Sequence, residues 1–188
     1  MELTSFTKAI DAGLRPLGFH RKKLTWNRKA GEYVDVVTLE ASKAGDMLTV
    51  DLGVANTSLF TLCWGRDFPG TVQPIDCTVR QRLRDRATGA ERWWDRDMES
   101  APGDISTAIN LDAVPFFDQM RTPQAMEQFL AEEEVDRKPY PLPRIYSVLI
   151  RVLEGRREES CEGLRAMLAS VPDAWRQRIT DVMGRLGC

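Results

Sequence analysis

The feature that most constrains the fold is the stretch from residue 14 to residue 54, which predicts consecutive strands joined by short turns. Residues 47–54 alternate between apolar and polar or small side chains, and this period of two is typical of a strand with one buried face. Residues 33–40 are rich in β-branched side chains and apolar on both faces, as expected for a covered central strand. Turn signals at 29–32 and 43–46 separate these segments. Because parallel neighbours need a long crossover, we expect an antiparallel meander.

A strongly basic strand is predicted at residues 19–29, ahead of the two apolar ones. Neither of its faces is cleanly apolar, so we place it at the edge of the sheet, where lysines discourage pairing with another edge. Before it, apolar side chains at helical spacing predict an amphipathic helix over about residues 3–15. Pro16 and Gly18 end that helix, because the residue before a proline avoids the α region and glycine tolerates a left-handed exit.

The second half of the chain predicts helices. Residues 56–76 are expected to be irregular, and residues 77–85 are a candidate fourth strand. Pro115 should kink or split a helix over 105–120. Three short helices after the proline-rich loop 139–143 predict an antiparallel bundle packed on or beside the sheet.

Together these patterns predict an α+β protein, an antiparallel β-sheet meander with an N-terminal helix and a helical C-terminal half. A length of 188 residues suits one domain, or one domain with a helical appendage. We divide the chain into an α+β sheet domain at 1–130 and a helical C-terminal extension at 131–188.

The bulk properties exclude some classes of protein. A hydrophobic content of 43% and a charged content of 29% indicate a folded chain rather than a disordered one. A net charge of −2 argues against a nucleic-acid binder built on overall positive charge, but it leaves room for a local basic patch. No secretory segment and no long apolar run stands out, so we expect a cytoplasmic protein with no membrane partner.

The cysteines and the single histidine offer little chemistry. Cys63, Cys77, Cys161 and Cys188 form no CxxC pair, and His20 is far from all of them in the sequence. We therefore expect reduced thiols, with Cys188 free in the tail, and neither a metal site nor a disulfide framework. A nucleophilic couple would have to use His20, which has no obvious orienting carboxylate. Glycine-rich phosphate loops are absent, and we expect no cofactor and no catalytic residue.

Several segments together carry a family resemblance. An amphipathic helix leads into LGFHRKKLTWNR, then YVDVVTLEAS and LTVDLGV, followed by CTVRQRL, a Trp-Trp pair and VPFFD. Over roughly residues 3–130 this pattern resembles the bacterial domain-of-unknown-function family 4304. Where related domains often have a glutamine near the end of the second strand, this chain has Glu40. The family carries no established activity, so the resemblance implies a fold and a bacterial origin and transfers no catalytic residue.

Four arginines at alternating positions form the sharpest candidate site. Arg80, Arg82, Arg84 and Arg86 would share one strand face and repel one another unless anions meet them. The functional interpretation is a docking surface for phosphate or for an acidic partner, since the forked guanidinium matches both. The structural interpretation is a solvated face neutralised by the protein's own acids.

The basic run from His20 to Lys23 is a second candidate. With Trp26 it could contact nucleic-acid phosphates and stack one base. In a single strand, His20 and Lys22 would share a face with Trp26, and Arg21 and Lys23 would lie on the other face. The alternative is a charged edge strand without a ligand.

Aromatic and acidic pairs complete the candidates. Trp93 and Trp94 could form a stacking platform or a protein hot spot, but adjacent strand residues point oppositely, so one buried and one semi-exposed tryptophan is the alternative. Asp35 and Asp51 could form a catalytic carboxylate pair on neighbouring strands, or each could be ion-paired with arginine.

These observations predict a non-catalytic protein-binding module with an immunity-like or regulatory role and a protein partner. The first alternative is a nucleic-acid-binding protein that uses a basic strand face. The second is an enzyme acting on a phosphorylated small molecule held by the arginines. The partner- or anion-binding candidates are Arg80, Arg82, Arg84, Arg86, Trp93, Trp94, Arg21 and Lys23.

Overall fold

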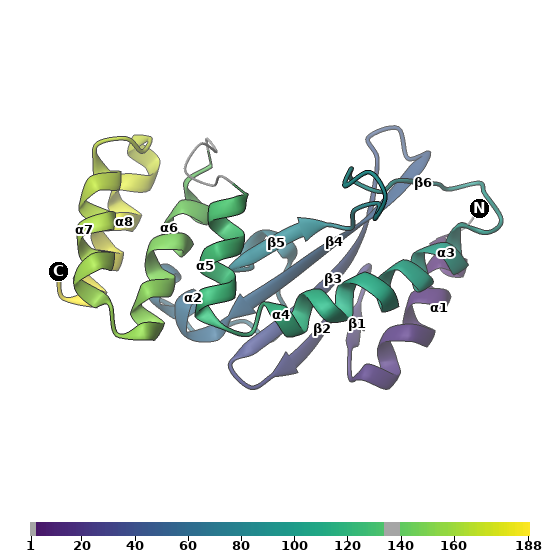
Figure 1. The fold of residues 1–188 in the computed structure, drawn as a ribbon, viewed down its shortest axis with the longest axis horizontal. Coiled ribbons are helices and arrows are strands. Elements are labelled where there is room, and N and C mark those ends of the chain that lie inside the picture. Colours follow the sequence, from purple (N-terminus) through teal and green to yellow (C-terminus); the bar gives the residue numbers. More distant parts are fainter. Residues whose placement is uncertain (1–2, 134–139) are drawn as a thin grey trace.

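A computed structural model describes residues 3–133 and 140–188 (Figure 1). Within these residues an antiparallel sheet follows an N-terminal helix, α1 (Leu3–Leu14), and leads into a helical C-terminal half. This arrangement confirms the predicted fold class. The strands are β1 (His20–Lys22), β2 (Thr25–Ala30), β3 (Tyr33–Ala41), β4 (Met47–Asn56), β5 (Val79–Arg82) and β6 (Trp94–Asp95).

The helices form two groups (Figure 1). Helices α1, α3 and α4 lie against the sheet, whereas α5–α8 gather with α2 at one end of the molecule. The helices after the first are α2 (Thr57–Trp64), α3 (Ala101–Ala108), α4 (Val114–Gln119), α5 (Pro123–Glu132), α6 (Pro141–Leu149), α7 (Arg157–Leu168) and α8 (Asp173–Leu186). Short 3-10 turns span Arg15–Leu17, Pro74–Asp76 and Ile150–Glu154.

The sheet is a meander in sequence order. Its path runs β1-β2-β3-β4-β5, and β6 pairs with β4 beyond the end of β5. The register pairs Asp35 with Val54 and Thr38 with Asp51. Two residues paired across an antiparallel sheet point to the same face, so this register decides which side chains meet the helices.

The basic strand predicted at 19–29 is wrong, because the structure folds it into a hairpin. Lys22 pairs with Thr25, which leaves Lys23 and Leu24 as a two-residue turn. Lys23 has a φ of 58°, in the left-handed region that tight hairpins require and that glycine or asparagine usually supplies. The hairpin gives the edge strand β1 only three residues, all of them exposed.

Both faces of β4 are buried, although its alternation predicted one wet face. Residues 66–78 fold over the far face, where a small second cluster joins Val34, Val36 and Ala55 to Val72 and Cys77. Gly53 permits this close approach, since a Cβ there would lie 2.5 Å from the Cys77 sulfur. A polar-looking strand face is therefore covered by a distant loop.

Helix α2 occupies a region that the sequence indicated to be irregular. It begins at the Asn56 cap, whose side chain accepts a hydrogen bond from the Leu59 amide at 2.9 Å. Its buried side chains are Leu59, Phe60 and Cys63. The helix packs against α6 and α8. One cluster of buried apolar side chains runs from α1 to α8, and the division at residue 130 stays a prediction.

Pro115 splits its helix, as predicted. Between α3 and α4 the backbone forms a π-helical segment, Ile109–Ala113. Because Pro115 has no N–H, it cannot donate to the Leu111 carbonyl four residues earlier. That carbonyl accepts a hydrogen bond from Arg86 at 2.8 Å, and the Asp112 carboxylate accepts another at 2.5 Å. Arg86 thus supplies the hydrogen bond that the Leu111 carbonyl cannot receive from Pro115.

A buried carboxylate joins the helices to the sheet. Asp35 is fully buried, and one of its oxygens accepts hydrogen bonds from Arg28 at 2.8 Å and from Arg121, just beyond α4, at 2.9 Å. The Arg28 guanidinium also lies over the rings of Phe19 and Phe117, 4.8 and 5.9 Å from their centroids. Burial raises the pKa of Asp35, and the two guanidiniums oppose that rise.

The expectation of four reduced thiols is wrong for two of them. Cys161 on α7 and Cys188 after α8 form a disulfide with their Cα atoms 5.6 Å apart. The antiparallel contact of α7 with α8 brings the two residues together across 27 positions of sequence, a proximity that spacing alone does not reveal. Cys63 and Cys77 are free and buried. Burial raises the pKa of the Cys63 thiol to about 12.

No helix among residues 3–133 and 140–188 combines the length and the apolar character needed to cross a membrane. Helix α5 ends at Glu132, the first residue of an acidic run over 132–134 whose last residue lies outside the described residues.

We predict that Cys188→Ser lowers the free energy of unfolding by about 3 to 4 kcal/mol, because the unfolded chain loses a loop closure of this length. Urea unfolding with and without dithiothreitol measures it. The wild type should lose about the same amount on reduction, whereas the variant should not respond. If the urea midpoint of the wild type is the same with and without dithiothreitol, the disulfide is contradicted. The thiols of Cys63 and Cys77 should react with iodoacetamide only after unfolding, which serves as the control for native packing.

Candidate functional site

The structure breaks the predicted row of arginines. Strand β5 ends at Arg82, so only Arg80 and Arg82 lie side by side on one face of it, paired with Gly53 and Asp51 of β4. Arg84 follows in an isolated bridge with Glu91, and Arg86 lies in the turn beyond. The four arginines therefore do not form one surface.

Three of these arginines are neutralised by the protein's own acids. Arg82 donates to Asp51 at 3.1 Å and to Glu91 at 2.7 Å. Arg84 donates to Glu133 at the end of α5, at 2.6 Å, and Arg86 is held by Asp112 as described above. The structural interpretation of the arginines fits this geometry better than an empty anion site.

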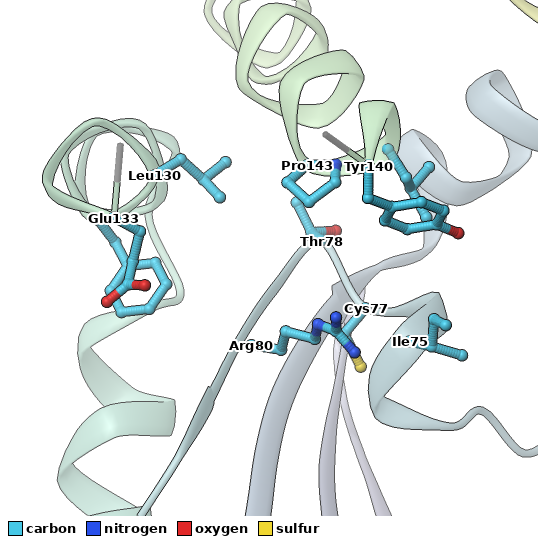
Figure 2. Close-up of a pocket in the computed structure, with 10 residues that line it drawn as sticks. Ile75, Cys77, Thr78, Arg80, Leu130, Glu133, Tyr140 and Pro143 are labelled. Carbon is cyan, nitrogen blue, oxygen red and sulfur yellow. The ribbon is translucent and has the colours of Figure 1, made fainter. Parts of the chain in front are cut away.

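Arg80 borders a small hollow between β5, α5 and the start of α6 (Figure 2). Figure 2 shows its side chain extending toward Cys77 and away from Glu133. The hollow has a volume of about 70 Å³. A second hollow, where Arg80 meets Arg82 and Arg84, has about 270 Å³ and is lined by three carboxylates. Both lie below the roughly 300–1,000 Å³ of typical small-molecule sites.

The two tryptophans divide as adjacent strand residues should. Trp94 is buried and Trp93 is 37% exposed. The Arg82 guanidinium lies 5.3 Å from the Trp93 ring centroid, and that of Arg92 lies 4.8 Å from the Trp94 ring. They do not make a shared stacking platform.

Asp35 and Asp51 do not form a carboxylate pair. Three register positions separate them, so Asp35 points to the helices and Asp51 to the opposite face. Burial raises the pKa of Asp51, and Arg82 opposes the rise. Each carboxylate is ion-paired with arginine, which was the alternative interpretation.

The β1–β2 hairpin instead builds a cleft that we call the basic cleft. His20 pairs with Asn27 and Lys22 with Thr25, so these side chains share one sheet face with Lys29, two residues beyond Asn27. The opposite wall is the loop 68–71. The volume is about 610 Å³, larger than the hollows beside the arginines. The lining residues are His20, Arg21, Lys22, Asn27, Lys29, Gly31, Glu32, Val34, Thr57, Phe68, Pro69, Gly70 and Thr71.

Asn27 fixes the loop that forms the second wall. Its amide nitrogen donates to the Val72 carbonyl at 3.2 Å, and its oxygen accepts from the Val72 N–H at 2.7 Å. Thr25 donates to the Gln73 side chain at 3.1 Å, and Phe68 meets Phe60 of α2 edge to face, with centroids 5.0 Å apart. The walls of the basic cleft are therefore held in place without a ligand.

The positive charges of the basic cleft are those of Lys22 and Lys29, beside the ring of His20. Within the described part of the chain, the side chains of His20, Lys22 and Lys29 form no ion pair and no hydrogen bond. Glu32 is the one carboxylate in the lining. Arg21 lines the cleft too, but its guanidinium turns to Asp11 of α1, 3.5 Å away.

Two members of the predicted basic site lie elsewhere. Lys23 occupies the exposed hairpin turn and does not line the cleft. Trp26 is completely buried and donates its ring N–H to Asp11 at 2.7 Å, so it cannot stack a base. The hairpin reverses the predicted facing, because the turn places Lys22 opposite Thr25 rather than beside Trp26.

Sequence reasoning missed Lys29, Asn27 and Phe68 as parts of a site. Lys29 was assigned to a turn, and nothing near Phe68 marks it as a wall over a strand 40 residues earlier. The signal that could have exposed the hairpin was the length of the basic segment, which is too long and too polar for one edge strand.

Comparisons with known proteins give a family and no function. A family model described as "Domain of unknown function (DUF4304)" matches residues 10–119. No curated protein and no solved structure matches the chain. The match covers the end of α1, all the strands of the sheet and all of α4, and so includes every residue of the basic cleft.

We predict that Asn27→Ala lowers the free energy of unfolding by about 1 to 3 kcal/mol, because it leaves both backbone groups of Val72 buried without their partner. It should also speed proteolytic cleavage within residues 66–73. Thermal unfolding and mass-spectrometric mapping of early cuts measure the two effects. Thr71→Ala is the control, because Thr71 lies in the same loop but takes no part in the pair of hydrogen bonds between Asn27 and Val72, which we call the clamp. If the protease cuts the Asn27→Ala variant no faster than this control, the clamp does not hold the loop.

Proposed function

We propose that this chain, which belongs to the DUF4304 family, is a non-catalytic module that binds an acidic segment of a partner protein in the basic cleft. An immunity-like or regulatory role is the version we favour, since such a protein acts by occupying its partner. The proposal needs no cofactor.

The distribution of charge carries the proposal. The protein has a net charge of −2, and Arg82, Arg84 and Arg86 are matched by its own carboxylates. The cations of the basic cleft are not matched in this way within the described residues. Lys22 and Lys29 leave two positive charges at one cleft, and an acidic ligand would pair with them while their attraction steers association.

The same geometry favours a protein partner over nucleic acid. Trp26, which would have stacked a base, lies in the core. The remaining cations line one cleft of limited length, whereas single-strand binders track the backbone over a groove with successive aromatic platforms. A phosphorylated small molecule is less favoured, because Arg82, Arg84 and Arg86 are paired with carboxylates. The two hollows that Arg80 lines are small.

We predict that Lys22→Glu combined with Lys29→Glu lowers the affinity for the partner at least about tenfold, because each reversal replaces an attraction with a repulsion. Partners captured from a lysate of the source organism by the wild type should be identified by mass spectrometry and then measured one by one with purified protein. Lys43→Glu, an exposed lysine in the β3–β4 turn, makes the same type of change outside the cleft and should bind normally.

Two results would overturn the proposal. One is equal affinity of the wild type and the double variant for every captured partner. The other is a captured species that is RNA or DNA, with binding that falls steeply with salt. Circular dichroism of each variant checks that the fold is intact.

A further inference from the structure

The basic cleft has two unlike walls. On one side β1 and β2 present His20, Lys22 and Lys29. On the other side Phe68 and Pro69 stand above Val34 of β3, and Phe68 packs on the small apolar cluster beneath the loop. Charge and apolar surface are thus separated across the width of the cleft.

The cationic wall has a definite length. Lys22 lies level with Thr25 of β2 and His20 level with Asn27, and Lys29 follows two positions further. Four residues of strand separate the first level from the last, which corresponds to about 13 Å. An extended peptide of four to five residues has this length, at up to about 3.3–3.6 Å per residue, whereas a single phosphate would engage only one end.

An extended peptide also has the right symmetry for two unlike walls. Successive side chains of an extended chain point to opposite sides, so residues i, i+2 and i+4 line one side and residues i+1 and i+3 the other. Acidic residues on the first side would meet Lys22 and Lys29, with the His20 ring between them as a hydrogen-bond partner. Apolar residues on the second side would lie against Phe68 and Pro69.

We infer that the basic cleft recognises an extended segment in which acidic and apolar residues alternate over about five positions. This inference rests on the proposed function and names the partner's motif. The cations supply orientation and attraction, and the apolar wall supplies contact area that charge alone does not use. The hydrogen bonds between Asn27 and Val72 fix the loop wall relative to β2 before the ligand arrives, which lowers the ordering cost of binding.

Two capped synthetic pentapeptides of identical composition test the motif. One has the alternating order Glu-Leu-Glu-Leu-Glu and the other the block order Glu-Glu-Glu-Leu-Leu. Both carry the same charge, so a purely electrostatic site binds them equally. Fluorescence anisotropy at low ionic strength should show the alternating peptide binding about tenfold more tightly, since only it presents both leucines to the apolar wall.

The variants separate the two levels of the hypothesis. Phe68→Ala should remove most of the preference for the alternating peptide, whereas Lys22→Glu with Lys29→Glu should weaken both peptides. Lys43→Glu should change neither. Because the two peptides are compared on the wild type, the main result does not depend on any variant folding.

The possible results distinguish failure of the alternating motif from failure of the proposed function. Equal binding of both peptides, lost in the double lysine variant, would overturn the alternating motif and leave the proposed function standing. Binding of neither peptide, or binding unaffected by the lysine variants, would overturn both. A preference for the alternating peptide that survives Phe68→Ala unchanged would also overturn the inference, because the apolar wall would then not be its source.

Discussion

The ion cluster around Asp35 is the interaction on which the arrangement of helices and sheet depends. A fully buried carboxylate on β3 receives guanidinium groups from β2 and from the end of α4. Burial raises its pKa despite both partners, which means that ionisation of Asp35 costs more in the folded protein than in water. Buried ion pairs of this kind contribute little net stability compared with apolar side chains, and losing one partner is costly. Here they join β2 and the residue that follows α4 to one carboxylate of β3, at the position that α4 takes over the sheet.

That position has consequences on the opposite face. With α1, α3 and α4 covering one side of the sheet, the apolar side chains of β3 and β4 that point the other way need separate cover. The loop 66–78 supplies it, with Gly53 leaving room for Cys77. The loop covers β3 and β4 and is hydrogen-bonded to β2 at Asn27 and Thr25. The space between loop residues 68–71 and the basic side chains of the β1–β2 hairpin is the basic cleft. The cleft is thus a consequence of how two layers of unequal width pack on one sheet.

Local sequence patterns predicted most helices and strands correctly, but they did not predict the contacts between these elements. The β-branched run at 33–40 predicts a strand and the proline at 115 predicts a helix interruption, each from a few neighbouring residues. Both predictions were correct. The hairpin depended on Lys23 adopting a left-handed φ without the glycine that normally signals it. The disulfide depended on two helices packing side by side, and the arginines met acids up to 49 positions away. Such facts arise from tertiary packing, which no local window contains.

Tertiary packing also explains why the candidate site lies at the basic cleft and not at the arginines of residues 80–86. Alternation of arginine within residues 80–86 is conspicuous in the sequence, yet a row of like charges on a strand is stable only when something neutralises it, and Glu91, Glu133 and Asp112 do so. The cations of β1 and β2 look less orderly because a turn separates them, and the turn is what brings them together. Lysines on a short edge strand also prevent two copies of that edge from pairing. In our proposal the charges that repel another copy of β1 are also those that attract an acidic chain, so one set of side chains would both protect the edge and recognise the partner.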